Sequence, residues 1–221
     1  LAFIKEKQES YIDAFSLFEK AAYAGNDIAQ FKLGEYYCNG KVEKSVEKGR
    51  FWLEKAAEKD NLDSLNLLGK YYEDKNIEKA LEYFQRALKF HDKDANFNIA
   101  NYYLDKEFEK AKKYFTRAFE FGKIDSFYIL GKAYLEGIFI EKNVKEAKYY
   151  LERAIEKGDL NSKFLLGKIL LDPELGIRNF HRAFILLEEA SDFGNKEAML
   201  ILADLYEQGL GVMKNINEAD R

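Results

Sequence analysis

The chain has 221 residues, of which 47% are hydrophobic and 33% charged, so it can bury a substantial core and is not a disordered chain. Its 35 basic and 39 acidic side chains give a net charge of −4, which argues against a dedicated binder of nucleic acids or anionic membranes. The single cysteine, Cys38, excludes an intramolecular disulfide framework, and no apolar run approaches the roughly 20 residues of a membrane span.

Along the chain, one pair of residues recurs at a nearly constant spacing. It is a Leu-Gly or a variant of it, at Leu33-Gly34, Leu68-Gly69, Ile99-Ala100, Leu130-Gly131, Leu166-Gly167 and Leu202-Ala203. The successive intervals are 35, 31, 31, 36 and 36 residues, by subtraction of these positions. A period in this range is typical of solenoids, in which each repeat is one supersecondary unit.

A second landmark follows each Leu-Gly pair. Small residues recur at Ala14, Gly49, Ala80, Ala111, Ala147, Ala183 and Ala219, and large apolar residues three positions later, at Leu17, Trp52, Tyr83, Tyr114, Tyr150 and Leu186. A further alanine lies four residues beyond each large residue, so the three columns share one helical face. This pattern predicts two helices per repeat, which approach closely at the small residues.

The landmarks predict an all-α fold: one solenoid of stacked antiparallel helix pairs over residues 1–221. We expect five complete repeats, at residues 26–60, 61–91, 92–122, 123–158 and 159–194. A residue that can adopt positive φ should end each second helix, at Gly25, Gly122, Gly158 and Gly194, with Asp60 and His91 in the same slot. The single proline, Pro173, lies in a connection.

The two ends carry incomplete repeats. Residues 11–25 read as a second helix with no recognisable first helix, and Ala219 begins a second helix that stops at Arg221. Because solenoids usually protect their ends with polar capping repeats, we expect this chain to be a fragment of a longer protein.

The pattern resembles the Sel1-like repeat family, which is related to the tetratricopeptide repeats. The clearest copies run from Ala29 to Tyr37 and on to Trp52–Glu58, and from Leu130 to Tyr134 and on to Ala154–Gly158. The two 31-residue repeats depart from it, with short connections like those of tetratricopeptide repeats. The resemblance implies a right-handed superhelix whose concave surface is lined by the first helices, and a role in binding other proteins.

Candidates for catalysis or metal binding are scarce. The two histidines, His91 and His181, lie in different repeats and cannot form a usual zinc site with one cysteine. Neighbouring carboxylates such as Glu188 and Glu189 do not face a common point on a helix. There is no nucleophile elbow and no phosphate-binding glycine loop. We therefore expect no enzymatic activity, no cofactor and no metal.

The implied concave surface supplies the candidate binding residues. Each first helix supplies two candidates. One lies three positions before the second residue of the Leu-Gly landmark, and the other lies one position after it. The candidates are Asn66, Lys70, Phe97, Asn101, Tyr128, Lys132, Phe164 and Lys168. In this interpretation the aromatic rings anchor an extended peptide and the lysines and asparagines donate hydrogen bonds. The alternative is that the rings pack between repeats and the lysines only maintain solubility.

The sequence thus predicts a scaffold or adaptor that binds a partner protein or an extended peptide. Two alternatives remain: an enzyme or accessory factor acting on the cell wall, and an architectural spacer without a ligand. Exposed aromatic rings on the concave face would favour the scaffold over the spacer. The many Lys, Asn and Ile residues suit an AT-rich bacterial genome, and bacterial members of the resembling family often work in the envelope, although a cytoplasmic location stays open.

Overall fold

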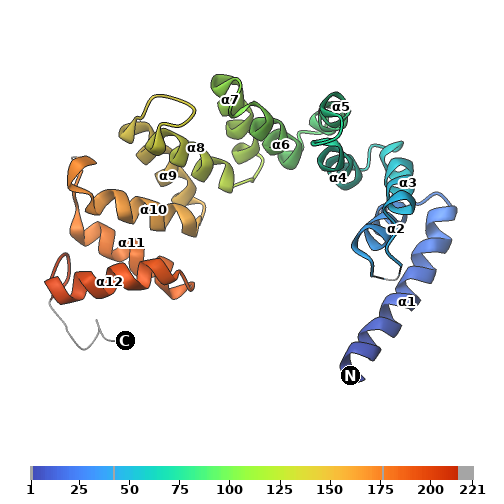
Figure 1. Cartoon of the computed structure of the whole chain (residues 1–221), viewed down its shortest axis with the longest axis horizontal. Helices are drawn as coiled ribbons and strands as arrows, with labels where there is room; N and C mark the ends of the chain where they lie inside the picture. Colours follow the sequence, from blue (N-terminus) through green and yellow to red (C-terminus); the bar gives the residue numbers. More distant parts are fainter. Residues whose placement is uncertain (1, 42, 176, 214–221) are drawn as a thin grey trace. The chain divides into compact units, whose positions relative to one another are not determined.

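Every regular element of the protein is a helix in the computed structural model, which describes residues 2–41, 43–175 and 177–213 (Figure 1). The chain forms two compact units, an N-terminal unit of residues 1–99 and a C-terminal unit of residues 100–221. The predicted fold class, an all-α solenoid of paired helices, is confirmed. The predicted repeat boundaries stay a prediction, and Ala219 lies outside the described residues.

The N-terminal unit stacks two helix pairs on a longer first helix. Its helices are α1 (Ala2–Tyr23), α2 (Asp27–Asn39), α3 (Val46–Ala57), α4 (Leu62–Tyr72), α5 (Ile77–Leu88) and the beginning of α6 (Lys93–Tyr103). Within a pair α2 packs against α3 and α4 against α5, and neighbouring pairs meet where α3 contacts α4. The sequence pattern predicted a helix over residues 11–25, whereas the observed helix α1 begins at Ala2 and ends at Tyr23.

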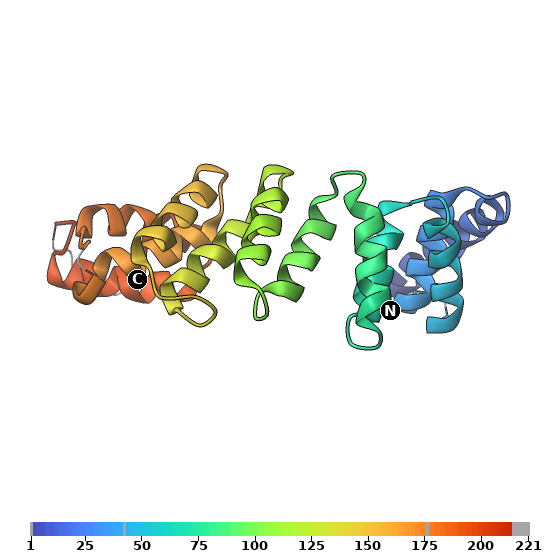
Figure 2. The ribbon, with the colours of Figure 1, turned by 90° about the horizontal axis from the view of Figure 1, so that it is seen from above.

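The C-terminal unit continues the alternation, and its helices run back and forth between turns (Figure 2). It contains the end of α6 and α7 (Phe108–Glu120), α8 (Asp125–Glu136), α9 (Val144–Glu156), α10 (Leu160–Leu171), a 3-10 turn at Pro173–Leu175, α11 (Phe180–Asp192) and α12 (Lys196–Gln208). The even-numbered helices are the first helices of the repeats. α8 also packs directly against α10, so first helices of successive repeats are in contact.

Local polar residues decide where the helices begin and end. In the described structure, side chains before nine helices accept a hydrogen bond from the backbone N–H three residues later, and these caps are Asn26, Ser45, Asn61, Asn76, Asp92, Asn143, Asp159, Asn179 and Asn195. After the second helices, Asp60 and His91 adopt φ values of 55° and 56° in the slot where other repeats have glycine. This confirms the equivalence that the spacing predicted.

The two helices of a repeat approach each other closely at the glycine of the Leu-Gly landmark. A Cβ atom on Gly131 would lie 2.7 Å from Cγ of Leu151, and one on Gly167 would lie 2.8 Å from Cγ of Leu187. Both leucines are fully buried. A side chain at these two positions would force the helices apart, which explains why they carry glycine.

The large apolar column is buried less uniformly than the spacing predicts. Trp52 and Tyr150 are buried, Tyr83 and Tyr114 are half-buried, and Leu17 is 67% exposed. Trp52 packs in a cluster with Ala29 and Leu33 of α2. Leu17 differs because it lies on α1, whose main packing partner in the described structure is α2.

Candidate interaction surface

The eight candidate binding residues lie on four first helices. Asn66 and Lys70 are on α4, Phe97 and Asn101 on α6, Tyr128 and Lys132 on α8, and Phe164 and Lys168 on α10. A spacing of four residues places both members of each pair on the same side of their helix. The contact between α8 and α10 brings the pairs of these two helices onto neighbouring elements of the C-terminal unit.

The aromatic members are neither free nor fully buried. Tyr128 packs against a core cluster that contains Leu151 and Leu166, and Phe164 packs against the cluster around Phe184 and Leu187. Both rings are half-buried, as is Phe97. Tyr128 and Phe164 therefore fill space between helices and stay partly accessible to solvent. The predicted role of all three rings as peptide anchors stays a prediction.

The cationic members are exposed but differ in their partners. Lys132 lies 3.7 Å from Glu136 on its own helix. Lys168 Nζ donates to Glu197 Oε1 at 2.6 Å, which joins α10 to α12, and it lies 5.2 Å from the centre of the Phe164 ring. Exposed ion pairs of this kind stabilise a fold by about 0–1 kcal/mol, so a charged ligand can compete for these lysines.

Asn66 contributes to the structure of the N-terminal unit. Its Nδ2 donates to Asp92 Oδ1 at 2.8 Å, and the same oxygen accepts from the backbone N–H of Ala95 at 2.6 Å. Asn66 thereby ties α4 to the start of α6. By contrast, Lys70 and Asn101 are exposed at the surface. Asn66 is thus the least accessible polar candidate.

Stacked tyrosine pairs form a second recurring feature, which sequence reasoning did not identify as pairs. Tyrosines of the first helices lie nearly parallel to tyrosines of the second helices, with centroid distances of 5.9 Å for Tyr72–Tyr83, 6.3 Å for Tyr103–Tyr114 and 5.7 Å for Tyr134–Tyr150. The spacing predicted the column of the second helices that contains Tyr83, Tyr114 and Tyr150, but only the fold brings these rings face to face with tyrosines of the first helices. Burial raises the pKa of Tyr150 to about 12.

Lysines accompany these tyrosines. Lys110 Nζ lies 3.7 Å from the centre of the Tyr103 ring, and Lys112 Nζ donates to the Tyr134 hydroxyl at 3.1 Å. In the N-terminal unit, Lys79 Nζ donates to the Tyr72 hydroxyl at 2.9 Å, and this bond raises the pKa of the Lys79 ammonium. The lysines thus hold the rings in place between helices.

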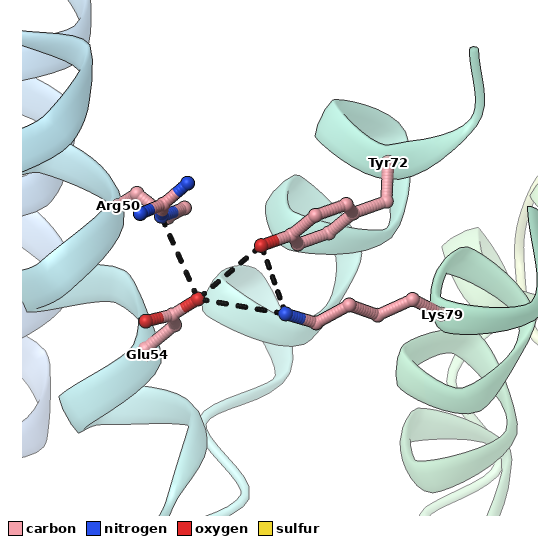
Figure 3. Close-up of polar contacts among 4 residues, drawn as sticks. All are labelled: Arg50, Glu54, Tyr72 and Lys79. Carbon is pink, nitrogen blue, oxygen red and sulfur yellow. Dashed lines mark hydrogen bonds and ion pairs between the residues drawn. The ribbon is translucent and has the colours of Figure 1, made fainter. Parts of the chain in front are cut away.

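Figure 3 shows how one such lysine belongs to a polar cluster that joins α3, α4 and α5. Glu54 Oε1 accepts from the Tyr72 hydroxyl at 3.4 Å and lies 3.7 Å from Arg50 Nε and 3.9 Å from Lys79 Nζ. All four residues are half-buried. The cluster links neighbouring helix pairs, and its geometry is that of a structural network between repeats.

Reactive groups are sparse in the part of the chain that the structure describes. No three His, Cys, Asp or Glu side chains there gather closely enough to hold a metal ion. Burial raises the pKa of the Cys38 thiol, which keeps it protonated and weakly nucleophilic. The described helices include none with the length and apolar character needed to cross a bilayer.

Comparison with known proteins identifies the repeat. The sequence profile of the Sel1 repeat matches the chain seven times, at residues 6–26, 27–61, 63–89, 94–120, 128–159, 161–195 and 196–219. The two short repeats, whose connections look like those of tetratricopeptide repeats, match the same profile. No curated protein sequence matches this chain.

Solved bacterial structures share the fold. A protective antigen of uropathogenic Escherichia coli strains, described as an SLR fold, has a TM-score of 0.80 and 24% identity, over 93% of this chain and 46% of that one. A Sel1 repeat protein from Oxalobacter formigenes has a TM-score of 0.76 and 26% identity, over 91% of this chain and 62% of that one. An immunity protein from Pseudomonas aeruginosa has a TM-score of 0.56 and 19% identity, over 80% of this chain and 72% of that one. This chain spans less than two thirds of the length of the Escherichia coli and Oxalobacter formigenes proteins.

Proposed function

Because the chain belongs to the Sel1 repeat family, we propose that it is a non-enzymatic scaffold that binds an extended segment of a partner protein along its first helices. Repeats of this family generally serve as scaffolds for protein interactions, and their solenoid is typically non-enzymatic. We assign the contact in the C-terminal unit to the face of α8 and α10 that carries Lys132 and Lys168, and Lys70 and Asn101 hold the equivalent positions on α4 and α6.

The observation that carries this proposal is the recurrence of an exposed polar side chain at one position of successive first helices. Lys132 and Lys168 occupy this position on α8 and α10, which are in contact. Neighbouring repeats thus offer one ammonium group each to a chain that lies across them. Ammonium groups donate to backbone carbonyls and to carboxylates, so they can hold a peptide without requiring one sequence.

The half-buried rings complete this surface. Tyr128 and Phe164 lie one helical turn before the two lysines and are already held in place by core clusters. A ring that is fixed before binding loses little conformational entropy when a ligand covers its exposed edge. We therefore assign the rings to the apolar floor of the surface and the lysines to its polar contacts.

An architectural spacer is the second candidate, and one contact favours it. The ion pair of Lys168 with Glu197 already uses one candidate lysine to join two helices, α10 and α12. In a pure spacer, the other exposed lysines would serve only solubility. The two functions differ in whether reversing the charge of this face affects the recovery of a partner.

The test is affinity capture from a native cell extract with the intact chain and with a variant carrying Lys70→Glu, Lys132→Glu and Lys168→Glu. The matched control carries Lys89→Glu, Lys113→Glu and Lys157→Glu, which reverses three exposed lysines on or just after second helices. Circular dichroism establishes that both variants remain helical. We expect a partner that the intact chain and the control recover and the first variant loses. Equal recovery by all three proteins would refute the proposed surface and favour the spacer.

A further inference from the structure

A pocket of about 530 Å³ opens on the N-terminal unit, and none of the eight candidate residues lines it. Its walls come from α1, α2 and α3, and four of its residues are aromatic: Tyr23, Tyr37, Phe51 and Trp52. The ring of Trp52 meets Tyr23 edge-on at a centroid distance of 5.0 Å and Phe51 at 5.2 Å. The mutual packing of these rings fixes the shape of the pocket.

Two of these aromatic residues are unusually accessible. Tyr23 is 74% exposed and Phe51 51% exposed, whereas Trp52 beneath them is buried. Exposed aromatic side chains around a concavity are the usual energetic centre of a binding site, because they bring a large area and few rotatable bonds. Their π faces also attract cations that lie within roughly 6 Å of the ring centre.

The charges that line the pocket have an acidic excess. Glu19 and Glu47 line it together with Lys48. The Lys48 ammonium is already paired with Glu43, with Nζ 3.0 Å from Oε2. No cation of the described structure lies within ion-pair distance of Glu19 or Glu47. Two carboxylates are therefore available beside the aromatic walls.

One contact within the protein illustrates the chemistry that the pocket favours. The Lys48 ammonium, besides its ion pair, lies 5.4 Å from the centre of the Tyr37 ring. A cation at the edge of the pocket is thus stabilised by an aromatic face and a carboxylate together. The exposed rings and the two available carboxylates offer the same combination to a cation from outside.

We propose that this aromatic and acidic pocket binds an arginine side chain of a partner protein. A guanidinium group is planar, stacks on aromatic rings and donates two parallel hydrogen bonds to a carboxylate, so it matches both components of the site. An ammonium group can use the carboxylates but stacks less well. The pocket shares no residue with the surface around Lys132 and Lys168 that we propose for the peptide. A test of the arginine site can therefore fail without affecting the proposed scaffold function, and the reverse also holds.

Trp52 provides a direct measurement, because it is the only tryptophan of the chain. The probe is a short synthetic peptide of glycine and serine with one central arginine, titrated against the intact chain while tryptophan fluorescence is recorded. Two matched peptides carry citrulline, the neutral isostere of arginine, or lysine at the centre. We expect the arginine peptide to bind roughly tenfold more tightly than the citrulline peptide, with the lysine peptide between them.

Protein variants locate the binding. Glu19→Gln together with Glu47→Gln should weaken arginine binding roughly fivefold to tenfold, since both changes keep the side-chain shape and remove the charge. The control, Glu58→Gln together with Glu78→Gln, alters two exposed carboxylates of the same unit and should leave binding unchanged. The proposal is overturned by equal affinity for arginine and citrulline, by equal affinity for arginine and lysine, by equal loss in both double variants, or by the absence of any fluorescence change.

Discussion

The close contact between Gly131 of α8 and Leu151 of α9 makes a specific prediction for an alanine at position 131. In an isolated helix, alanine is more favourable than glycine by about 1 kcal/mol. In the folded protein its methyl group would lie 2.7 Å from Cγ and 2.8 Å from Cδ2 of Leu151, and 3.2 Å from the backbone oxygen of Ala147. We therefore expect Gly131→Ala to destabilise the protein.

The expected magnitude follows from two opposing effects. Overpacking a buried contact costs about 2–3 kcal/mol when a backbone atom and a fully buried side chain resist the new group. The gain in helix propensity offsets about 1 kcal/mol of this cost. The net decrease in the free energy of unfolding is then about 1–2 kcal/mol.

A double-mutant cycle with Leu151→Ala isolates the contact. Removing the Leu151 side chain eliminates two of the three close approaches and by itself costs about 3–4 kcal/mol, because this side chain is fully buried. In that background Gly131→Ala should be neutral or stabilise the fold by up to about 1 kcal/mol. The two substitutions should therefore show a coupling energy of about 2 kcal/mol.

Urea unfolding followed by far-UV circular dichroism measures all four proteins of the cycle. We expect Gly131→Ala to destabilise the intact protein, and to be neutral or stabilising when Leu151 is replaced by alanine. Equal effects in both backgrounds, or a stabilised Gly131→Ala single variant, would show that the landmark glycine is not required by the approach of the two helices.

Two further predictions concern a helix cap and a buried tyrosine. Asp159→Ala removes the carboxylate oxygen that lies 2.6 Å from the Ser162 amide, and should lower the free energy of unfolding in urea by about 1 kcal/mol, whereas Asp159→Asn should retain most of the stability. Tyr150 has a pKa of about 12 and an unfolded tyrosine one of about 10, so between these pH values only the unfolded state releases the proton and stability falls as pH rises. Tyr150→Phe should make this alkaline decrease less steep, and an unchanged slope would contradict the assigned burial.

The sequence by itself determined the architecture. The Leu-Gly and alanine columns predicted helix pairs because helical periodicity is local, so residues three, four and seven positions apart share a face in any helix. The slot shared by Gly25, Asp60 and His91 could also be predicted, because a helix end depends on a few neighbouring residues. The membership of the Sel1 repeat family depends on the same columns.

Only the tertiary structure decided how the side chains of different helices are used. It half-buries Tyr128 and Phe164 against core clusters and pairs Lys168 with Glu197, so the candidate surface is less open than its spacing suggests. It also gathers Tyr23 and Trp52 from separate helices into one pocket. The physical reason is that such contacts depend on the separation and rotation of helices that lie far apart in sequence, which a local periodicity does not specify.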